Sequence, residues 1–293
     1  MEEGRIIKAL SGFYYVQVNG KIYECRGRGV FRKRNITPLV GDFVSFEKTD
    51  HDKGYIIEIK PRMNQLDRPP IANINQAAIV CSATEPDFSP VLLDKFLVKV
   101  EAKQIKPIIF ITKMDLVTDE LRADIEQYKK DYEQIGYSVE LIVCKEGSDL
   151  AYLADYFSQQ VTVIAGQSGV GKSSLLNAIN PNLSLKTSEI STSLGRGRHT
   201  TRHVELIEIH DGLVADTPGF SSLDLDDIEA NQLGDCFPEM LERKNMCQFR
   251  GCLHDQEPRC AVKHAVESGE MNNYRYQHYL MFLNEIQSRK PRY

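Results

Sequence analysis

The chain has 293 residues, a net charge of −5, 42% hydrophobic residues and seven cysteines. This length exceeds what one small core needs and predicts two or three domains. No apolar run is long enough to span a membrane, and MEEGRIIKAL lacks the basic start and apolar centre of a signal peptide. We therefore expect a cytoplasmic protein without membrane contact.

The first 60 residues contain short strand-like runs at 5–10, 13–18, 21–27, 42–48 and 55–60, separated by Gly, Asn and Asp. This pattern predicts a five-stranded barrel of the OB type. A basic run follows the third strand, and we expect it to contact RNA backbone rather than form a merely solvated loop; its cations are Arg26, Arg28, Arg32, Lys33 and Arg34.

Aromatic residues of the same region could stack on bases, although at least half of them should fill the barrel; they are Phe13, Tyr14, Tyr15, Tyr23 and Phe31. Residues 60–70 are rich in Pro and Arg and predict a linker.

The pattern changes at Asn75 to alternating strands and helices. Strands are predicted at 76–82, 105–112, 137–143 and 161–166, and helices at 90–104, 119–136 and 173–180. This alternation indicates a parallel sheet covered by helices. Residues 203–209 and 212–217 predict an antiparallel pair at the edge of that sheet. After Asp226 the strands stop, and the sequence to 289 is mainly helical in pattern.

Residues 166–173 form the phosphate-loop motif GxxxxGKS between a predicted strand and helix: Gly166, Gln167, Ser168, Gly169, Val170, Gly171, Lys172 and Ser173. The glycines let backbone N–H groups point at phosphate oxygens, Lys172 should reach the β- and γ-phosphates, and Ser173 should bind Mg²⁺. The alternative is a glycine-rich turn that matches the motif by chance, and the predicted strand before it and helix after it argue against this. The loop predicts a nucleotide without saying which one.

Asp216-Thr217-Pro218-Gly219 matches the DxxG motif that follows such loops. Asp216 would hold Mg²⁺ through water, and the Gly219 N–H would sense the γ-phosphate. In the polar stretch before it, Thr201 is the expected second Mg²⁺ ligand, with Thr200 as the alternative. Phe220 stands where related enzymes orient water with Gln, so intrinsic turnover should be slow. His199 is the nearest local candidate for the missing group.

The base should be read by Thr112, Lys113, Met114 and Asp115. A carboxylate at the fourth position can accept hydrogen bonds from guanine N1–H and N2–H₂, whereas adenine lacks the N2 amino group. This argues against an ATPase or a metabolite kinase. The usual first residue is Asn, so Thr112 is a departure. Cys144 and Lys145 occupy the place of the second base-contacting loop.

The motifs occur in a rotated order, with base tetrad and second base loop before phosphate loop, switch I and DxxG. Permutation leaves a fold unchanged in space when its termini lie close together. The chain leaves the domain directly after the DxxG segment, so nucleotide state should move a module attached there.

Three cysteines and a histidine lie within fourteen residues: Cys247, Cys252, His254 and Cys260. They suit a structural, tetrahedral Zn²⁺ with no open position, rather than unpaired thiols or a catalytic metal. Cys236 and His264 are expected to be packing residues. We expect the metal to replace a core that this short module cannot build.

Together, the permuted motifs, the N-terminal barrel and the C-x4-C-x-H-x5-C tail resemble the ribosome small subunit-dependent GTPase A family (RsgA, also YjeQ or YloQ) over essentially the whole chain. The resemblance implies an α/β multidomain protein with an OB-fold, a circularly permuted P-loop GTPase domain and a C-terminal zinc-binding domain, at 1–68, 69–225 and 226–293. It extends the phosphate contacts to Ser174 and assigns zinc to the four ligands above.

The resemblance also implies a GTPase stimulated by the small ribosomal subunit that acts late in that subunit's maturation. GTP, GDP, Mg²⁺, one Zn²⁺ and ribosomal RNA are then the expected ligands of a monomeric protein. A GTP-gated RNA-binding adaptor with negligible catalysis is the alternative, because Phe220 cannot position water.

Overall fold

The computed structural model describes residues 1–29, 31, 36–49, 52–143, 150–180, 183, 204–220 and 223–289, with the backbone alone for 216–220. The chain forms two compact units. The first contains Met1–Val80 and Cys144–Ser221, and the second contains Cys81–Val143 and Ser222–Tyr293. The division into three domains stays a prediction.

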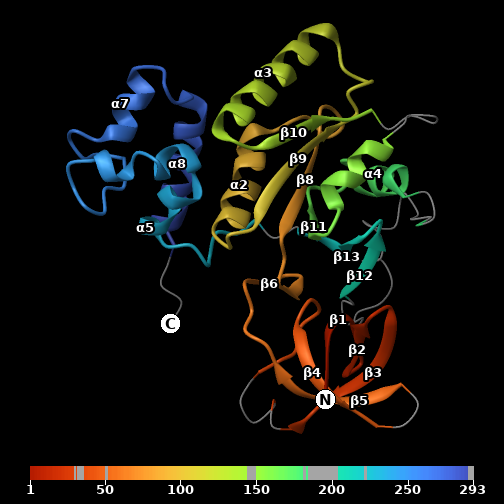
Figure 1. Cartoon of the computed structure of the whole chain (residues 1–293). Helices are drawn as coiled ribbons and strands as arrows, with labels where there is room; N and C mark the ends of the chain where they lie inside the picture. The colour runs from red at the N-terminus through yellow and green to blue at the C-terminus, as the bar shows by residue number, and fades with distance from the viewer. Residues whose placement is uncertain are drawn as a thin grey trace. The chain divides into compact units, whose positions relative to one another are not determined.

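The first unit begins with a closed barrel (Figure 1), whose strands are β1 (Glu2–Leu10), β2 (Phe13–Val18), β3 (Lys21–Gly27), β4 (Phe43–Lys48) and β5 (Lys53–Ile59). β1 pairs antiparallel with both β2 and β4, and β3 runs parallel to β5, which closes the ring through β4. Alternating side chains such as Ile6, Val16 and Phe46 are fully buried inside it. The predicted five-stranded barrel is confirmed.

The predicted linker is instead structured. It forms a small hairpin of β6 (Gln65–Asp67) and β7 (Pro70–Ala72). Arg62 donates from Nε to Asp42 Oδ1 at 2.7 Å and from Nη2 to Asp42 Oδ2 at 2.8 Å, and Asp42 is fully buried. The composition of 60–70 does not reveal this hairpin or its ion pair with the barrel, because a contact with a residue 20 positions away leaves no local signal.

A parallel sheet follows in the same unit, with β8 (Gln76–Ser82), β11 (Val161–Ala165) and β13 (Gly212–Phe220). β12 (Val204–Ile209) pairs antiparallel with β13. The 3₁₀ helix η1 (Ala151–Phe157) precedes β11, and α4 (Lys172–Ile179) follows it.

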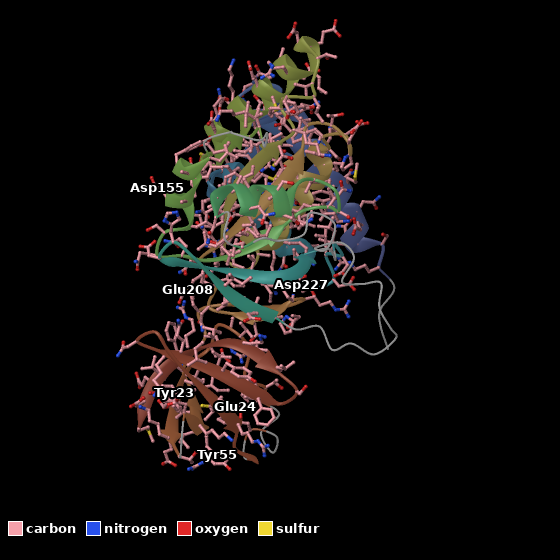
Figure 2. All side chains as sticks on the ribbon, turned by 90° about the vertical axis from the view of Figure 1, so that its right-hand side faces the viewer. Tyr23, Glu24, Tyr55, Asp155, Glu208 and Asp227 are labelled. Atoms are coloured by element: carbon pink, nitrogen blue, oxygen red, sulfur yellow. The ribbon has the colours of Figure 1, made fainter. Side chains whose placement is uncertain are left out.

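The predicted antiparallel pair of β12 and β13 is confirmed, and β12 also has a second partner. It pairs antiparallel with β1 of the barrel, Lys8 opposite Glu205 and Ala9 opposite Val204. The Lys8–Glu205 ion pair at 2.7 Å and a 2.7 Å hydrogen bond from Gln17 to Glu208, a residue labelled in Figure 2, support the junction. A pairing between segments nearly two hundred residues apart leaves no local sequence signal.

The second unit contains the parallel strands β9 (Lys106–Thr112) and β10 (Ser138–Leu141). Two helices accompany them, α2 (Pro90–Glu101) and α3 (Asp119–Ile135). Ser89 and Thr118 cap the helix starts with side-chain oxygens, and Gly136 ends α3 in the left-handed conformation.

The C-terminal part of this unit is helical, as predicted. Its elements are α5 (Ala230–Leu233), η3 (Gly234–Cys236), α6 (Pro238–Leu241), η4 (Lys244–Met246), α7 (Ala261–Glu267) and α8 (Asn273–Gln287). They enclose a buried apolar cluster that includes Phe237, Tyr279, Phe282 and, from α2, Val98. The module therefore has a buried apolar core of its own, to which α2 adds Val98, whereas we expected a metal in place of such a core. In the described part of the chain, no helix is long and apolar enough to cross a membrane.

Candidate nucleotide and metal sites

The phosphate loop lies between β11 and α4, as its motif predicts. Gly166 has φ 136°, and a Cβ there would lie 2.2 Å from the Val80 carbonyl oxygen, so only glycine fits. Gly171 is the left-handed N-cap of α4, with φ 89°. Gln167, Ser168 and Gly169 are exposed between them. The backbone of this loop can therefore present N–H groups to phosphate.

Lys172 and Ser173 begin α4 and are both buried, 8% and 6% exposed. The Lys172 ammonium donates to the Gly166 carbonyl at 2.9 Å and to the Gln167 carbonyl. Burial lowers the pKa of Lys172. The loop's own carbonyl groups thus hold the ammonium in place against the loop.

The base tetrad follows β9 in the second unit. Thr112 is 1% exposed, and its hydroxyl donates to the Cys81 carbonyl at 3.2 Å. Lys113 has φ 60°, which turns the chain out of the strand. The Met114 N–H donates to Ile142 O at 3.3 Å. Thr112 therefore has a part in anchoring the loop, a role that the motif alone does not reveal.

Several predicted residues lie outside the described part of the chain: Arg32, Lys33, Arg34, Cys144, Lys145, His199, Thr200 and Thr201. The DxxG segment ends β13, and only its backbone is described, which includes Asp216, Gly219 and Phe220. Their assignments stay predictions.

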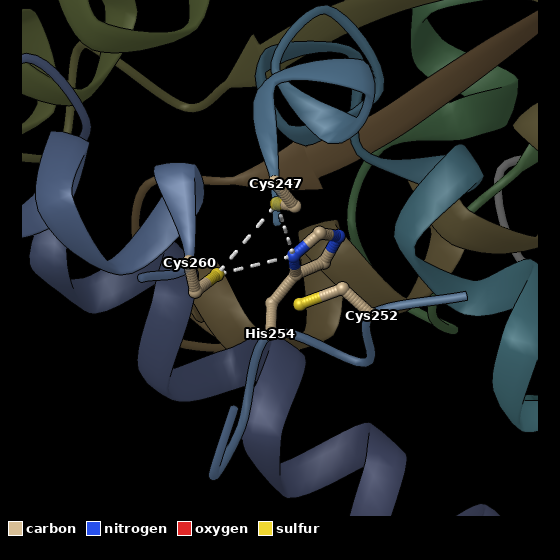
Figure 3. Close-up of side chains that lie close together, drawn as sticks. All are labelled: Cys247, Cys252, His254 and Cys260. Carbon is tan, nitrogen blue, oxygen red and sulfur yellow. Dashed lines mark hydrogen bonds between the residues drawn. The ribbon is translucent and has the colours of Figure 1, made fainter. Parts of the chain in front are cut away.

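The cysteine cluster comes together as predicted (Figure 3). The ligand atoms of Cys247, Cys252, His254 and Cys260 all lie within 4.8 Å of one another, so the cluster could hold one metal ion. His254 directs Nδ1 to the thiols, 3.6 Å from Cys247 Sγ and 3.3 Å from Cys260 Sγ. The two sulfur atoms are 3.9 Å apart. Burial lowers the pKa of His254, which favours the neutral, ligating imidazole.

Residues that the motif does not name shape this loop. Glu257 accepts the Leu253 N–H at 2.7 Å and the Asp255 N–H at 3.0 Å. Burial alone would raise the pKa of Glu257, but these backbone donors outweigh it and lower the pKa. Tyr276 donates to the His254 carbonyl at 2.7 Å, and His254 itself has φ 57°. The sequence signal for Glu257 is only its place between two ligands.

The remaining described cysteines are packing residues. Burial raises the pKa of Cys25 to about 11 and that of Cys81 and Cys236 to about 12, which keeps these thiols protonated and unreactive. The packing role predicted for Cys236 is confirmed. His264 is exposed, so the same expectation is wrong there.

The described part of the basic run carries exposed cations. Arg26 stacks on Phe13, 4.5 Å from the ring centre, and Arg28 forms a 2.6 Å ion pair with Glu47. Tyr23 and Phe31 are buried, whereas Tyr55 of β5 is 45% exposed on the barrel surface (Figure 2). Part of the aromatic set is therefore barrel core, as expected.

Comparisons with known proteins cover the whole chain. The sequence profile of the RsgA GTPase matches residues 59–226, and that of the RsgA N-terminal domain matches residues 3–56. A protein of Oceanobacillus iheyensis named small ribosomal subunit biogenesis GTPase RsgA 2 is 61% identical over 293 residues, 100% of each chain.

Two solved structures are also similar. The crystal structure of YloQ, described as a circularly permuted GTPase, matches with a TM-score of 0.86 at 54% identity, over 100% of this chain and 97% of that one. YjeQ from Thermotoga maritima matches with a TM-score of 0.87 at 34% identity, over 98% of this chain and 99% of that one.

Proposed function

Since the chain belongs to the RsgA GTPase family, we propose that it hydrolyses GTP in response to the small ribosomal subunit and assists late maturation of that subunit. The chain is a circularly permuted GTPase with an N-terminal OB-like barrel and a C-terminal helical region that carries a Cys₃His cluster. The observation that carries the proposal is the phosphate loop, with buried Lys172, in a chain that matches these relatives from end to end.

The nucleotide is held by two groups of residues in this proposal. Phosphates contact Gly166 through Ser174, while Mg²⁺ is held by Ser173, Thr201 and, through water, Asp216. The base contacts are Thr112, Lys113, Met114, Asp115, Cys144 and Lys145, with the Asp115 carboxylate accepting from guanine N1–H and N2–H₂.

Hydrolysis requires an oriented water and stabilised charge on the transferred phosphoryl group. Lys172 supplies charge, the Gly219 N–H responds to the γ-phosphate, and Mg²⁺ neutralises phosphate oxygens when bound. Phe220 has no polar atom to orient water. His199 or a group of the ribosomal subunit would supply this function.

The Cys₃His cluster would hold structural Zn²⁺. With Zn–S about 2.3 Å and Zn–N about 2.0 Å, tetrahedral geometry separates two thiolates by about 3.8 Å and a thiolate from nitrogen by about 3.5 Å. The spacings of 3.9 Å, 3.6 Å and 3.3 Å in the cluster agree with these values.

The barrel is the proposed contact with ribosomal RNA, through Arg26, Arg28, Arg32, Lys33 and Arg34. Exposed arginine and aromatic side chains suit phosphates and unstacked bases. The protein would act as a cytoplasmic monomer, in three domains at 1–68, 69–225 and 226–293.

Phosphate release from GTP and from ATP, with and without purified small subunits, tests this proposal. We expect turnover specific for GTP that rises roughly tenfold or more with subunits and is lost in Lys172→Ala. If GTP turnover were the same with and without small subunits, the proposed role of the ribosome would be contradicted. Negligible turnover even with subunits would favour the GTP-gated adaptor.

A further inference from the structure

A buried ionic cluster lies in the second unit, separate from the Cys₃His cluster, and its centre is Arg275 of α8. The Arg275 side chain is fully buried, and so is Asp94 of α2. Arg275 donates from Nε and Nη2 to the two carboxylate oxygens of Glu239 on α6, at 2.8 and 3.1 Å, and from Nη1 to Asp94 Oδ1.

Asp94 makes two further contacts. Tyr132 of α3 donates its hydroxyl to Asp94 Oδ1 at 2.7 Å. His278 of α8 has Nδ1 2.5 Å from Asp94 Oδ2. The Arg275 guanidinium also lies over the Phe237 ring, 4.8 Å from its centre. The cluster thus joins α2, α3, α6 and α8 by directional bonds.

Burying charges costs desolvation energy, and a well-packed apolar cluster would stabilise these helices about as well. What an ionic cluster adds is a single register, because its bonds form in only one arrangement of the helices. The bonds of Asp94 to Arg275 and His278 therefore tie α2 to α8 in a defined position.

α2 is followed by β9, which ends at the first tetrad residue, Thr112, and is preceded by a segment that contacts the tetrad. That segment, 81–89, ends at the helix cap Ser89 and lies along the tetrad. The Ala83 N–H donates to the Thr112 carbonyl at 2.9 Å, and the Thr112 hydroxyl donates to Cys81 O at 3.2 Å. Lys113 donates from Nζ to the Glu85 carbonyl.

α3, which follows the tetrad in the chain, also contacts it. Arg122 donates to the Met114 carbonyl at 2.7 Å, and Arg122 lies on the same helix as Tyr132. Both supports of the tetrad, the α2 segment and α3, therefore meet at Asp94 in the ionic cluster.

We infer that Arg275 and Asp94 are positioning residues for guanine recognition: through α2 and α3, the C-terminal helix α8 sets the position of the loop that carries Asp115. This inference rests on the proposed role of Thr112–Asp115 in base binding. A carboxylate that accepts two hydrogen bonds from one base edge depends on accurate placement, so a loosened loop loses guanine selectivity first.

Affinities of the full-length protein for GDP, inosine diphosphate and ADP, measured by calorimetry, test the inference. Inosine lacks only the N2 amino group, so the ratio of GDP to inosine diphosphate affinity reports on the Asp115 contact. In Arg275→Lys and Asp94→Asn we expect this ratio to fall about threefold or more and GDP affinity to fall about 5- to 20-fold. Tyr132→Phe, which removes one hydroxyl, provides a milder variant that keeps the fold.

The matched control is Glu285→Gln. Glu285 of α8 pairs with Lys95 of α2 at 2.7 Å, which joins the same two helices from the surface. Its loss should change neither affinity. The inference would be overturned if folded variants of Arg275 or Asp94 kept the wild-type ratio of GDP to inosine diphosphate affinity, which includes an equal fall in both affinities. A wild-type protein that does not distinguish these nucleotides would instead contradict the base assignment itself.

Discussion

The phosphate loop and the base tetrad are fixed in different ways. The phosphate loop takes its shape from its own backbone, with glycine at 166 and 171 and carbonyl groups that hold Lys172. The tetrad depends on residues outside its own segment, directly through Ala83 and through Arg122, which lies eight residues after Met114, and indirectly through the distant Arg275. A site shaped by its own backbone resists remote change, whereas one fixed by remote residues responds to it.

Loss of the metal should have the largest effect on stability. It would test how far the second unit, which carries the base tetrad, depends on a distant site. Cys260→Ser removes a buried thiol of the candidate metal site that also packs in the C-terminal core. We expect metal content to fall from about one per chain to near zero, and the free energy of unfolding of the second unit to fall by roughly 5 kcal/mol or more. Elemental analysis and chemical denaturation measure the two effects.

Cys236→Ala is the matched control for metal loss. Cys236 is a buried thiol, 4% exposed, outside the ligand set. This variant should keep its metal. Full metal content in Cys260→Ser would show that the cluster is not the site.

Breaking the ionic cluster comes next. Arg275→Met leaves Asp94 and Glu239 buried without their cation, and we expect a loss of about 3–5 kcal/mol in urea unfolding. Adding Asp94→Asn and Glu239→Gln should recover part of this loss, because the unpaired charges are then gone. A loss below about 1 kcal/mol in Arg275→Met would mean that the cluster does not hold the helices.

Substitutions within the phosphate loop test whether its shape depends on its own glycines. Gly166→Ala places a Cβ 2.2 Å from the Val80 carbonyl at φ 136°. We expect GTP turnover to fall about 100-fold, since the loop must shift. Gly169→Ala also has positive φ, 82°, but no atom lies within 4 Å of its Cβ. Gly169→Ala should therefore raise the activation free energy of GTP turnover by about 1 kcal/mol or less. Equal effects of the two substitutions would contradict the steric argument.

The smallest expected effect concerns Glu101, at the end of α2. Burial raises the pKa of Glu101, so the folded protein disfavours its carboxylate. That penalty is absent while the group is protonated in both states, below about pH 4.5, and it grows as pH rises toward the folded pKa. Glu101→Gln should therefore stabilise the protein at pH 7, by less than about 1 kcal/mol, and have no effect at pH 4. Thermal unfolding of the variant and the wild type at pH 7 and at pH 4 checks the sign of this stability change.

Local patterns predict a large part of this molecule. The alternation in 13–18 and 21–27 gives barrel strands, and the glycines together with Lys172 define the phosphate loop within a single motif. The four residues of the candidate metal site are equally visible because they all lie between Cys247 and Cys260. In each case the chemistry is complete within one short segment.

Long-range polar contacts are not predictable in this way. Arg275 and Asp94 are 181 residues apart, and each is indistinguishable from an exposed charge on an amphipathic helix. The ion pair of Arg62 with Asp42 and the pairing of β1 with β12 likewise leave no local signal in the sequence. These contacts form only when distant parts of the chain come together, and among them those of Arg275 and Asp94 bear on the tetrad.

Hydrogen exchange of backbone amides in Arg275→Lys, compared with the wild type, tests the difference between the two loops most directly. The Met114 and Leu116 amides, which donate to Ile142 O and Lys113 O, should exchange about tenfold faster or more in the variant. Amides in 166–174 should exchange at unchanged rates. Unchanged exchange at Met114 and Leu116, or equal acceleration in both loops, would contradict remote support of the base tetrad.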